Sequence, residues 1–334
     1  MADPVAAFLI AQGWGDARKE PLSGDGSVRR YLRLVDKGRR ALLMQCPPEL
    51  PIAPFVKVDA MLRKLDLSAP EIYATDAGAG LVLLEDFGDD TFSRLLAAGA
   101  DEASLYTLAV DVLIDLHRRA TPEALASLPP FDDARALDGL TRMLDWYWPA
   151  IHGAAAPESM RRDFDSAWRA VLPAMRLVPE SMALFDYHTD NLMRLDRPGL
   201  AACGLLDFQD AVRAPVVFDL ATLLENDRRT IPDALREALI ARYLAAFPAL
   251  DHDAFMTAFA VKTAHWNTRI VGTFARLLRR DGKAGYQRFM PRVWELVARH
   301  IRHPALAPVA EWYRRHLPPA DRRVLTPEEV RSKA

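Results

Sequence analysis

The sequence is poor in cysteine, lacks long apolar runs and has almost no net charge. Only Cys46 and Cys203 are present, far apart and without metal-ligand residues nearby, so neither a disulfide framework nor a zinc site is predicted. No run approaches the roughly 18 apolar residues that a membrane-spanning helix needs. The formal net charge of −2 gives no general attraction to nucleic acids or anionic membranes. A reducing cytoplasm is the expected location, and nothing indicates the oligomeric state.

The length and composition are those of a folded protein with a sizeable core. A chain of 334 residues is long enough for two domains, or for one large domain with two lobes. Half of the residues are hydrophobic and 26% are charged, so wholesale disorder is not expected. The opening MADPVAAFLIAQGWG has a short apolar stretch and an acidic start, which predicts an amphipathic helix beginning at Pro4 rather than a signal peptide.

Short β-prone runs and turn signals dominate the first hundred residues. Two pairs of runs flank turns and predict hairpins: 27–35 with 39–46, and 71–76 with 81–87. Between them, FVKVDAMLRKL (55–65) has helical spacing. The expectation is a small sheet carrying one helix.

Helical patterns take over after Thr91. They cover residues 101–119, 133–150, 158–175, 232–247, 253–279, 284–302 and 305–316. The interruption is 181–207, where the short apolar runs MALF and CGLL bracket a polar loop. Such a loop between short strands is a usual place for chemistry.

The polar loop FDYHTDNL (185–192) has the spacing DxxxxN from Asp186 to Asn191, and LLDF with Asp207 follows. Phosphoryl transfer needs a carboxylate to accept the proton of the attacking hydroxyl, and oxygen ligands for Mg²⁺ on the nucleotide phosphates. Asp186 suits the first role, and Asn191 and Asp207 suit the second. The pattern alone fits capped turns equally well, with Asp186 and Asp190 as caps and Asn191 in a left-handed position.

Several further motifs occur in a recognisable order. LFDYHTDN resembles the catalytic loop HGDLHPGN, and LDFQ (206–209) resembles the metal motif IDWE. In the same way, PVVFDLA (215–221) resembles PxxDLA, and LIDLH (113–117) resembles LxxLH. Together they resemble the aminoglycoside phosphotransferase and choline kinase-like enzymes, which share the protein kinase fold. The resemblance covers nearly the whole chain.

This resemblance implies an α+β, bilobal fold and the use of ATP and Mg²⁺. Residues 1–86 would form a nucleotide-binding lobe with a β-sheet, and 87–334 a helical lobe with the catalytic loop and the acceptor site. Asp186 would be the catalytic base, Asn191 and Asp207 the metal ligands, and Asp219 a brace for the loop.

Nucleotide binding is expected in the first lobe. SGDGS (23–27) could lie over phosphates or simply form a hairpin turn, and the run 83–86 occupies the hinge position. The candidate nucleotide-binding residues are Ser23, Gly24, Gly26, Ser27, Arg30, Leu83, Glu85 and Asp86.

Two positions depart from the family pattern. Leu184 stands where the family has a histidine before the catalytic aspartate, and Met44 and Gln45 replace the phosphate-binding lysine of the third strand. Arg29 or Arg30 could supply the missing charge. A kinase fold that binds without catalysing is the alternative.

The acceptor clue is the basic stretch 262–286, whose six Lys or Arg residues and single acid argue against choline and polycationic antibiotics. On a helix, the polar residues of this stretch would line one face beside an apolar face, although a solvated basic face fits equally well. The candidate acceptor contacts are His188, Asp190, His265, Arg269 and Arg276. For His188, orienting the loop is the expected role.

The sequence is most similar to the bacterial anomeric kinases of N-acetylmuramate and N-acetylglucosamine in cell-wall recycling. The similarity lies in three stretches: SGDGSVRRYLRL, the PPE at 47–49 and FARLLRRDGKAGY. That resemblance implies a C1 sugar kinase in which Arg269 or Arg276 binds the lactyl carboxylate of muramate. A kinase of another small acceptor, or a silent binding module, remains an alternative.

Overall fold

The computed structural model describes residues 3–22 and 28–331, which form two compact units. The first comprises Met1–Arg119 and Asp186–Ala211, and the second comprises Ala120–Phe185 and Val212–Ala334. Each unit is therefore built from two separate stretches of the chain. The predicted lobe boundary at residue 86 follows the last strand of the sheet, and the first unit continues beyond it, so that boundary stays a prediction.

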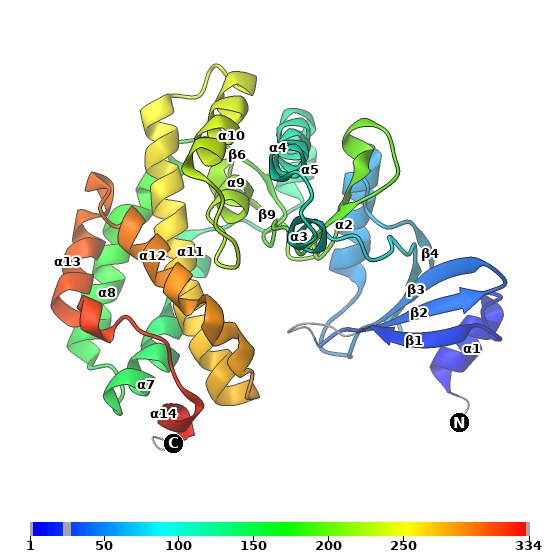
Figure 1. Ribbon diagram of the computed structural model, residues 1–334, viewed down its shortest axis with the longest axis horizontal. Helices are drawn as coiled ribbons and strands as arrows, with labels where there is room; N and C mark the ends of the chain where they lie inside the picture. Colours follow the sequence, from blue (N-terminus) through cyan, green and yellow to red (C-terminus); the bar gives the residue numbers. More distant parts are fainter. Residues whose placement is uncertain (1–2, 23–27, 332–334) are drawn as a thin grey trace. The chain divides into compact units, whose positions relative to one another are not determined.

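The first unit contains a five-stranded antiparallel sheet in the order β1-β2-β3-β5-β4 (Figure 1). Its strands are β1 (Arg18–Leu22), β2 (Arg30–Asp36), β3 (Arg39–Gln45), β4 (Ile72–Asp76) and β5 (Leu81–Leu84). Lys37 and Gly38, with φ of 47° and 83°, make the tight turn between β2 and β3, because two left-handed residues match the twist of a hairpin. Both predicted hairpins are confirmed.

Two helices accompany the sheet, and the sequence predicted both. α1 (Pro4–Ala11) begins at Pro4 as predicted, and its Phe8 and Leu9 pack with Trp14 on Leu34 and Leu43 of the sheet. α2 (Ala53–Lys64) buries Phe55, Val58, Asp59 and Leu62. Strand β1 was not predicted, because a proline such as Pro21 argues against a strand except at the edge of a sheet. β1 is such an edge strand.

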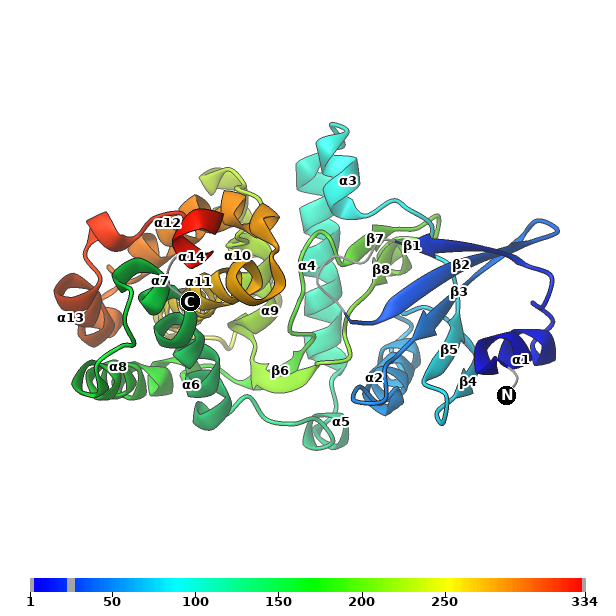
Figure 2. The same ribbon diagram turned by 90° about the horizontal axis from the view of Figure 1, so that it is seen from below.

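The rest of the first unit supports a short hairpin. α3 (Phe92–Ala97) and α4 (Glu102–Arg119) precede it along the chain, and β7 (Leu192–Arg194) pairs with β8 (Cys203–Leu205) (Figure 2). The Tyr187 hydroxyl donates to the Ala109 carbonyl of α4 at 2.8 Å, which anchors the polar loop before β7. The start of the loop 186–191 is thereby fixed to α4.

The second unit is a helical array with one two-stranded ribbon, β6 (Glu180–Ala183) and β9 (Val212–Pro215). Its α-helices are α5 (Pro122–Ala126), α6 (Asp133–Arg142), α7 (Trp148–His152), α8 (Glu158–Val171), α9 (Val217–Leu224), α10 (Asp233–Ala246), α11 (His252–Asp281), α12 (Met290–His300), α13 (Ala307–His316) and α14 (Pro327–Arg331). Figure 1 shows α12 along α11 and α13 beside α8. The predicted long helices are confirmed, whereas α14 lies beyond the last predicted helix, 305–316.

α11 is the centre of the second unit. Its 30 residues bury side chains on most sides, so the expected division into a polar and a core face does not hold along its whole length. A π-helical turn, Met143–Tyr147, splits the predicted helix 133–150, and α11 packs against it at Gly272. A Cβ at Gly272 would lie 2.2 Å from the Arg142 carbonyl carbon, so only glycine permits this approach.

Within the ranges that the structure describes, none of the helices is both long enough and apolar enough to span a membrane.

Candidate active site

A buried aspartate braces the chain that leads into the polar loop. The Asp219 carboxylate, on α9, accepts the backbone N–H groups of Leu184 at 2.5 Å and Phe185 at 3.1 Å. Asp219 is 1% exposed, so these bonds form away from water. Phe185 has a φ of 80°, which is a strained conformation for a bulky residue and persists only where the surroundings enforce it. The brace expected for Asp219 is present.

The loop itself is closed by bonds that connect Asp186 to Asn191. The Asn191 side-chain N–H₂ donates to the Asp186 carbonyl at 2.9 Å, and its backbone N–H donates to the His188 carbonyl at 2.9 Å. The His188 N–H also reaches the Asp186 carbonyl, at 3.1 Å. Because the amide nitrogen of Asn191 serves the loop, its amide oxygen is the atom that suits a cation.

The His188 ring lies within this loop rather than above it. Its Nδ1 is 3.3 Å from the Asp190 backbone nitrogen, and its Nε2 is 3.4 Å from Asn191 Nδ2. The Asp190 carboxylate lies 3.8 Å from the same ring. This geometry fits the expected orienting role, and acceptor contacts of His188 and Asp190 stay predictions.

Asp207 is the second residue with strained backbone, with a φ of 56°. The Leu206 N–H donates to the Asn191 carbonyl at 3.0 Å, so the two predicted metal ligands belong to directly bonded segments. The Asp207 side chain is 42% exposed, and its Oδ1 accepts from Gln209 at 2.8 Å. Strain at Phe185 and Asp207, on either side of this hairpin, is typical of a functional site.

The donor set suits magnesium. Among the described residues, no group of three or more His, Cys, Asp or Glu side chains could hold a metal by itself. Asn191 and Asp207 instead offer two hard oxygens, and Mg²⁺ usually takes one or two protein oxygens with phosphates and waters. The residues present therefore fit the metal that the loop motif implies.

The predicted nucleotide residues differ in their surroundings. Ser23, Gly24, Gly26 and Ser27 lie outside the described residues. Arg30 is exposed at the start of β2, and Leu83 is 1% exposed within β5. A cavity of about 660 Å³ is lined by Val28, Arg30, Gln45, Cys46, Pro47, Glu49 and Leu50. Arg30 thus has room for a ligand beside it.

The two acidic hinge residues hold the backbone in place. The Asp86 carboxylate is 1% exposed, lies 2.7 Å from Arg33 Nε and accepts the Gly88 N–H at 2.9 Å. The Glu85 N–H donates to the Glu71 carbonyl at 2.8 Å. These bonds engage the Asp86 carboxylate and the Glu85 backbone N–H, so nucleotide contacts of Glu85 and Asp86 stay predictions.

Arg197 clamps the hinge from the β7–β8 connection. Its guanidinium pairs with the Glu85 carboxylate, donates to Ser68 Oγ at 2.9 Å and lies 5.2 Å from the Phe87 ring centroid. The sequence offered no signal for this residue, because its partners are far away along the chain.

His265 lies inside the second unit. It is 1% exposed, its Nε2 is 2.9 Å from the Ala136 carbonyl, and the Phe131 and Trp168 rings meet it edge-on. Burial lowers the pKa of His265 to about 4, with smaller contributions in the same direction from the charges of Lys262 and Arg269. The ring is therefore neutral near pH 7 and packs α11 against α6, and a contact with the acceptor stays a prediction.

Two arginines lie over the ring of Phe185. The guanidinium carbon of Arg269 is 5.3 Å from that ring centroid and 4.5 Å from the Trp266 centroid, and Arg135 is 5.2 Å from Phe185. Phe185 immediately precedes Asp186 in the chain. Arg135 was not predicted, since nothing in the run DDARALD distinguishes it from an ordinary helical arginine.

Arg276 lies further along α11. It is half-buried, and burial together with the charges of Arg142 and Arg280 lowers its pKa from the usual value. Although Asp281 offsets part of it, the positive charge of the three arginines favours an anionic ligand. Arg269 and Arg276 thus both fit the predicted binding of a carboxylate, although neither contact is established.

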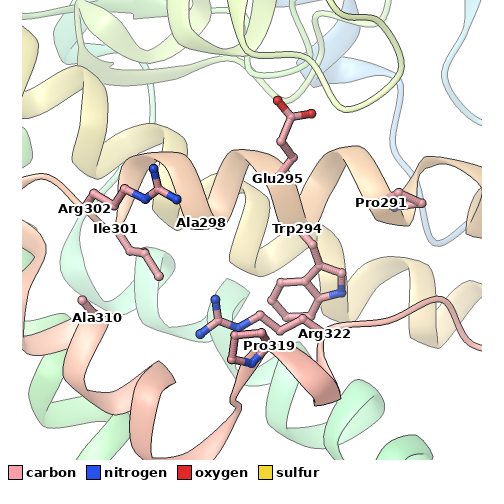
Figure 3. Close-up of a pocket in the computed structure, with 9 residues that line it drawn as sticks. All are labelled: Pro291, Trp294, Glu295, Ala298, Ile301, Arg302, Ala310, Pro319 and Arg322. Carbon is pink, nitrogen blue, oxygen red and sulfur yellow. The ribbon is translucent and has the colours of Figure 1, made fainter.

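Another cavity, of about 560 Å³, lies in the second unit between α12 and the segment that follows α13 (Figure 3). Trp294 and Arg322 approach the same space, whereas Glu295 leaves α12 on the opposite side. None of the predicted site residues lines it. The cavity is therefore separate from the residues that carry the proposed chemistry.

Comparison with known proteins identifies the family of the chain. The model of the phosphotransferase enzyme family matches residues 19–255. An N-acetylmuramate/N-acetylglucosamine kinase of Caulobacter vibrioides is 37% identical, over 95% of this chain and 97% of that protein. The kinase of the same name from Pseudomonas aeruginosa is 31% identical, over 91% of each.

Solved structures show the same fold at low identity. A choline/ethanolamine kinase family protein from Mesorhizobium loti has a TM-score of 0.62 with 13% identity, covering 93% of this chain and 98% of that one. The GDP complex of aminoglycoside 2′-phosphotransferase-IIIa has a TM-score of 0.60 with 14% identity, covering 90% and 99%. The predicted kinase-like α+β fold is confirmed. The chain belongs to the phosphotransferase enzyme family.

Proposed function

We propose that the protein is a cytoplasmic, ATP-dependent kinase that phosphorylates the C1 hydroxyl of N-acetylmuramate and N-acetylglucosamine, a reaction of cell-wall recycling. The observation that carries this function is the braced loop with Asp186 and Asn191 bonded to the Asp207 segment. It occurs in a chain that is 37% identical to a kinase named for these two sugars.

In this mechanism Asp186 orients the C1 hydroxyl and accepts its proton as the oxygen attacks the γ-phosphorus of ATP. The bond from that phosphorus to the β–γ bridging oxygen breaks, which leaves ADP and the sugar 1-phosphate. Asn191 and Asp207 would hold Mg²⁺, which when bound neutralises charge on the phosphates. The strained approach through Phe185 keeps Asp186 at a fixed position relative to Asn191.

The basic residues of the second unit support an acceptor with a carboxylate. N-acetylmuramate carries a lactyl carboxylate, and a guanidinium can bind it through two parallel hydrogen bonds. Arg269 and Arg135 both lie over the Phe185 ring, one residue before Asp186 in the chain. Arg269 is therefore our first choice for this contact, with Arg276 as the alternative.

The test is an assay of the purified protein with labelled ATP and Mg²⁺ against amino sugars, other sugars, choline and aminoglycosides. We expect turnover with N-acetylmuramate and N-acetylglucosamine, and a phosphorus NMR signal of an anomeric phosphate. A phosphate on C6, or turnover only with another acceptor, would exclude the anomeric amino-sugar kinase. Nucleotide binding by calorimetry without turnover on any acceptor would indicate a silent binding module.

The carboxylate contact is tested by Arg269→Met, which keeps much of the apolar stem and removes the charge. A charge-assisted hydrogen bond contributes about 1.5–3 kcal/mol, so kcat/KM for N-acetylmuramate should fall roughly ten-fold to a hundred-fold. N-acetylglucosamine has no carboxylate and should lose much less. Equal losses for both sugars would place Arg269 outside the contact, and Arg276→Met then tests the alternative.

A further inference from the structure

Strand β3 has no cation at the place where nucleotide phosphates need one. Its two basic residues lie at the turn end, where Arg39 donates to Asp36 at 2.7 Å and Arg40 lies 3.5 Å from Asp86. At the other end Met44 is fully buried, and the Tyr31 hydroxyl of β2 donates to its sulfur at 3.4 Å. Any cation for the phosphates must come from another element of the unit.

Arg29 is the arginine that the fold directs toward the proposed metal ligand. It immediately precedes β2, its side chain is 12% exposed, and Nη1 lies 4.0 Å from Asp207 Oδ1. This distance is too long for a hydrogen bond, so the attraction orients the two groups without joining them directly. The Asp207 side chain is 42% exposed, so ligands can reach it from solvent.

The neighbouring arginine has different surroundings. Successive residues of an extended chain point to opposite faces, and Arg30 is exposed and lines the cavity with Gln45 and Cys46. Of the two arginines that the sequence leaves open as a replacement cation, Arg29 is therefore the one with a direct relation to Asp207.

We propose that Arg29 binds the phosphates of the nucleotide and takes the place of the absent third-strand lysine, an inference that rests on the proposed kinase function. A guanidinium stays charged at any physiological pH and offers a planar fork that matches phosphate oxygens. Because Arg29 lies beside Asp207, it would add a second positive charge where the phosphates meet the proposed metal ligand. Arg29 is thus a binding residue for the reacting group.

The experiment compares the calorimetric affinities of ADP and adenosine, each with Mg²⁺, for the wild-type protein, Arg29→Met and Arg29→Lys. Arg29→Met should weaken ADP binding about ten-fold to a hundred-fold, the usual contribution of a charged hydrogen bond, and leave adenosine within about two-fold. Arg29→Lys keeps a charge and should recover part of the loss. Arg18→Met is the matched control, because Arg18 is on β1 of the same sheet and its side chain is 71% exposed.

Three results would overturn the inference. In the first, Arg29→Met binds ADP with the same affinity as Arg18→Met. In the second, Arg30→Met rather than Arg29→Met shows the loss of affinity that is specific to ADP. In the third, Arg29→Met weakens the binding of adenosine as much as the binding of ADP. Should Arg29→Met fail to fold in a thermal melt, Arg29→Lys and Arg29→Gln decide between the same outcomes. These affinities require no turnover, so a wild-type protein that binds ADP but phosphorylates no amino sugar contradicts the proposed function separately.

Discussion

The two units hold their polar residues in opposite ways. In the first, Asp186, Asn191 and Asp207 lie on short loops, are only partly buried and are joined by backbone hydrogen bonds. In the second, His265 and Arg269 lie on a long helix among aromatic rings, and their partners Ala136 and Phe185 belong to segments far away in the chain. The comparison teaches that the phosphoryl-transfer loop depends on local sequence, whereas the helical surroundings depend on packing.

The largest predicted effect is that of Asp186→Asn, which tests the polar loop of the first unit. It removes the proposed base but keeps the loop closed, since Asn191 bonds to the backbone carbonyl of residue 186 rather than to its side chain. Steady-state turnover should fall by about 10²–10⁴, the usual contribution of a general base, while calorimetry shows nucleotide affinity largely unchanged.

Asp190→Asn is the comparison within the same loop. The Asp190 carboxylate lies 3.8 Å from the His188 ring and is not a partner in the bond from Asn191 to the Asp186 carbonyl, so its replacement should cost less turnover than that of Asp186. If Asp190→Asn abolishes turnover and Asp186→Asn spares it, the assignment of the base is wrong.

A second prediction concerns the pH dependence of stability that His265 brings to the helical unit. Its pKa falls from 6.5 to about 4 because burial disfavours the charged ring. The unfolded chain therefore binds a proton at higher pH than the folded one, and the free energy of unfolding should decrease as pH falls from about 6.5 to about 4. A shift of this size corresponds to about 3 kcal/mol.

Denaturant unfolding between pH 4 and 7 measures this effect. In His265→Gln, the free energy of unfolding should depend less steeply on pH, because the contribution of His265 is gone. This holds whatever the stability of the variant at pH 7. The control is His252→Gln, whose side chain in the wild type is 70% exposed and which should keep the wild-type slope. The same slope in His265→Gln and the wild type would show that His265 does not cause the loss.

The smallest predicted effect comes from Gly272→Ala. In an exposed helix this exchange would stabilise by about 1 kcal/mol, but here the new Cβ would lie 2.2 Å from the Arg142 carbonyl carbon. Displacing the π-helical turn should instead cost about 1–3 kcal/mol in unfolding experiments. Gly285→Ala, with open space around its position, should be close to neutral. A stabilised Gly272→Ala would mean that α11 does not pack tightly there.

The sequence predicted the local structure of the first unit because each signal is short. The turn at Lys37 and Gly38, the DxxxxN spacing and Asp207 after an apolar run all lie within a few residues. Their outcome, two hairpins and a closed loop, depends mainly on backbone bonds between near neighbours. The Asp219 brace followed only from the family resemblance, because its partners are 34 and 35 residues away.

For the helical unit, the sequence predicted the helices but not the contacts between them. The spacing of His265 suggested a polar face, yet its helix is central and surrounded by α6, α9 and α12. Arg135 reaches Phe185 from another helix, and Arg197 reaches Glu85 from another hairpin. Periodicity describes one element at a time, so contacts between distant elements cannot be obtained from it.

The division of the chain has a consequence for its synthesis. Because the first unit needs residues 186–211, its β7–β8 hairpin cannot form when the ribosome has released only the first 119 residues. Translation at roughly 5–20 residues per second imposes a delay of several seconds while 120–185 emerge. Until then the nascent sheet lacks Asp207. A messenger RNA that slows translation of residues 120–185 would lengthen the time for which this incomplete unit is exposed to chaperones and proteases.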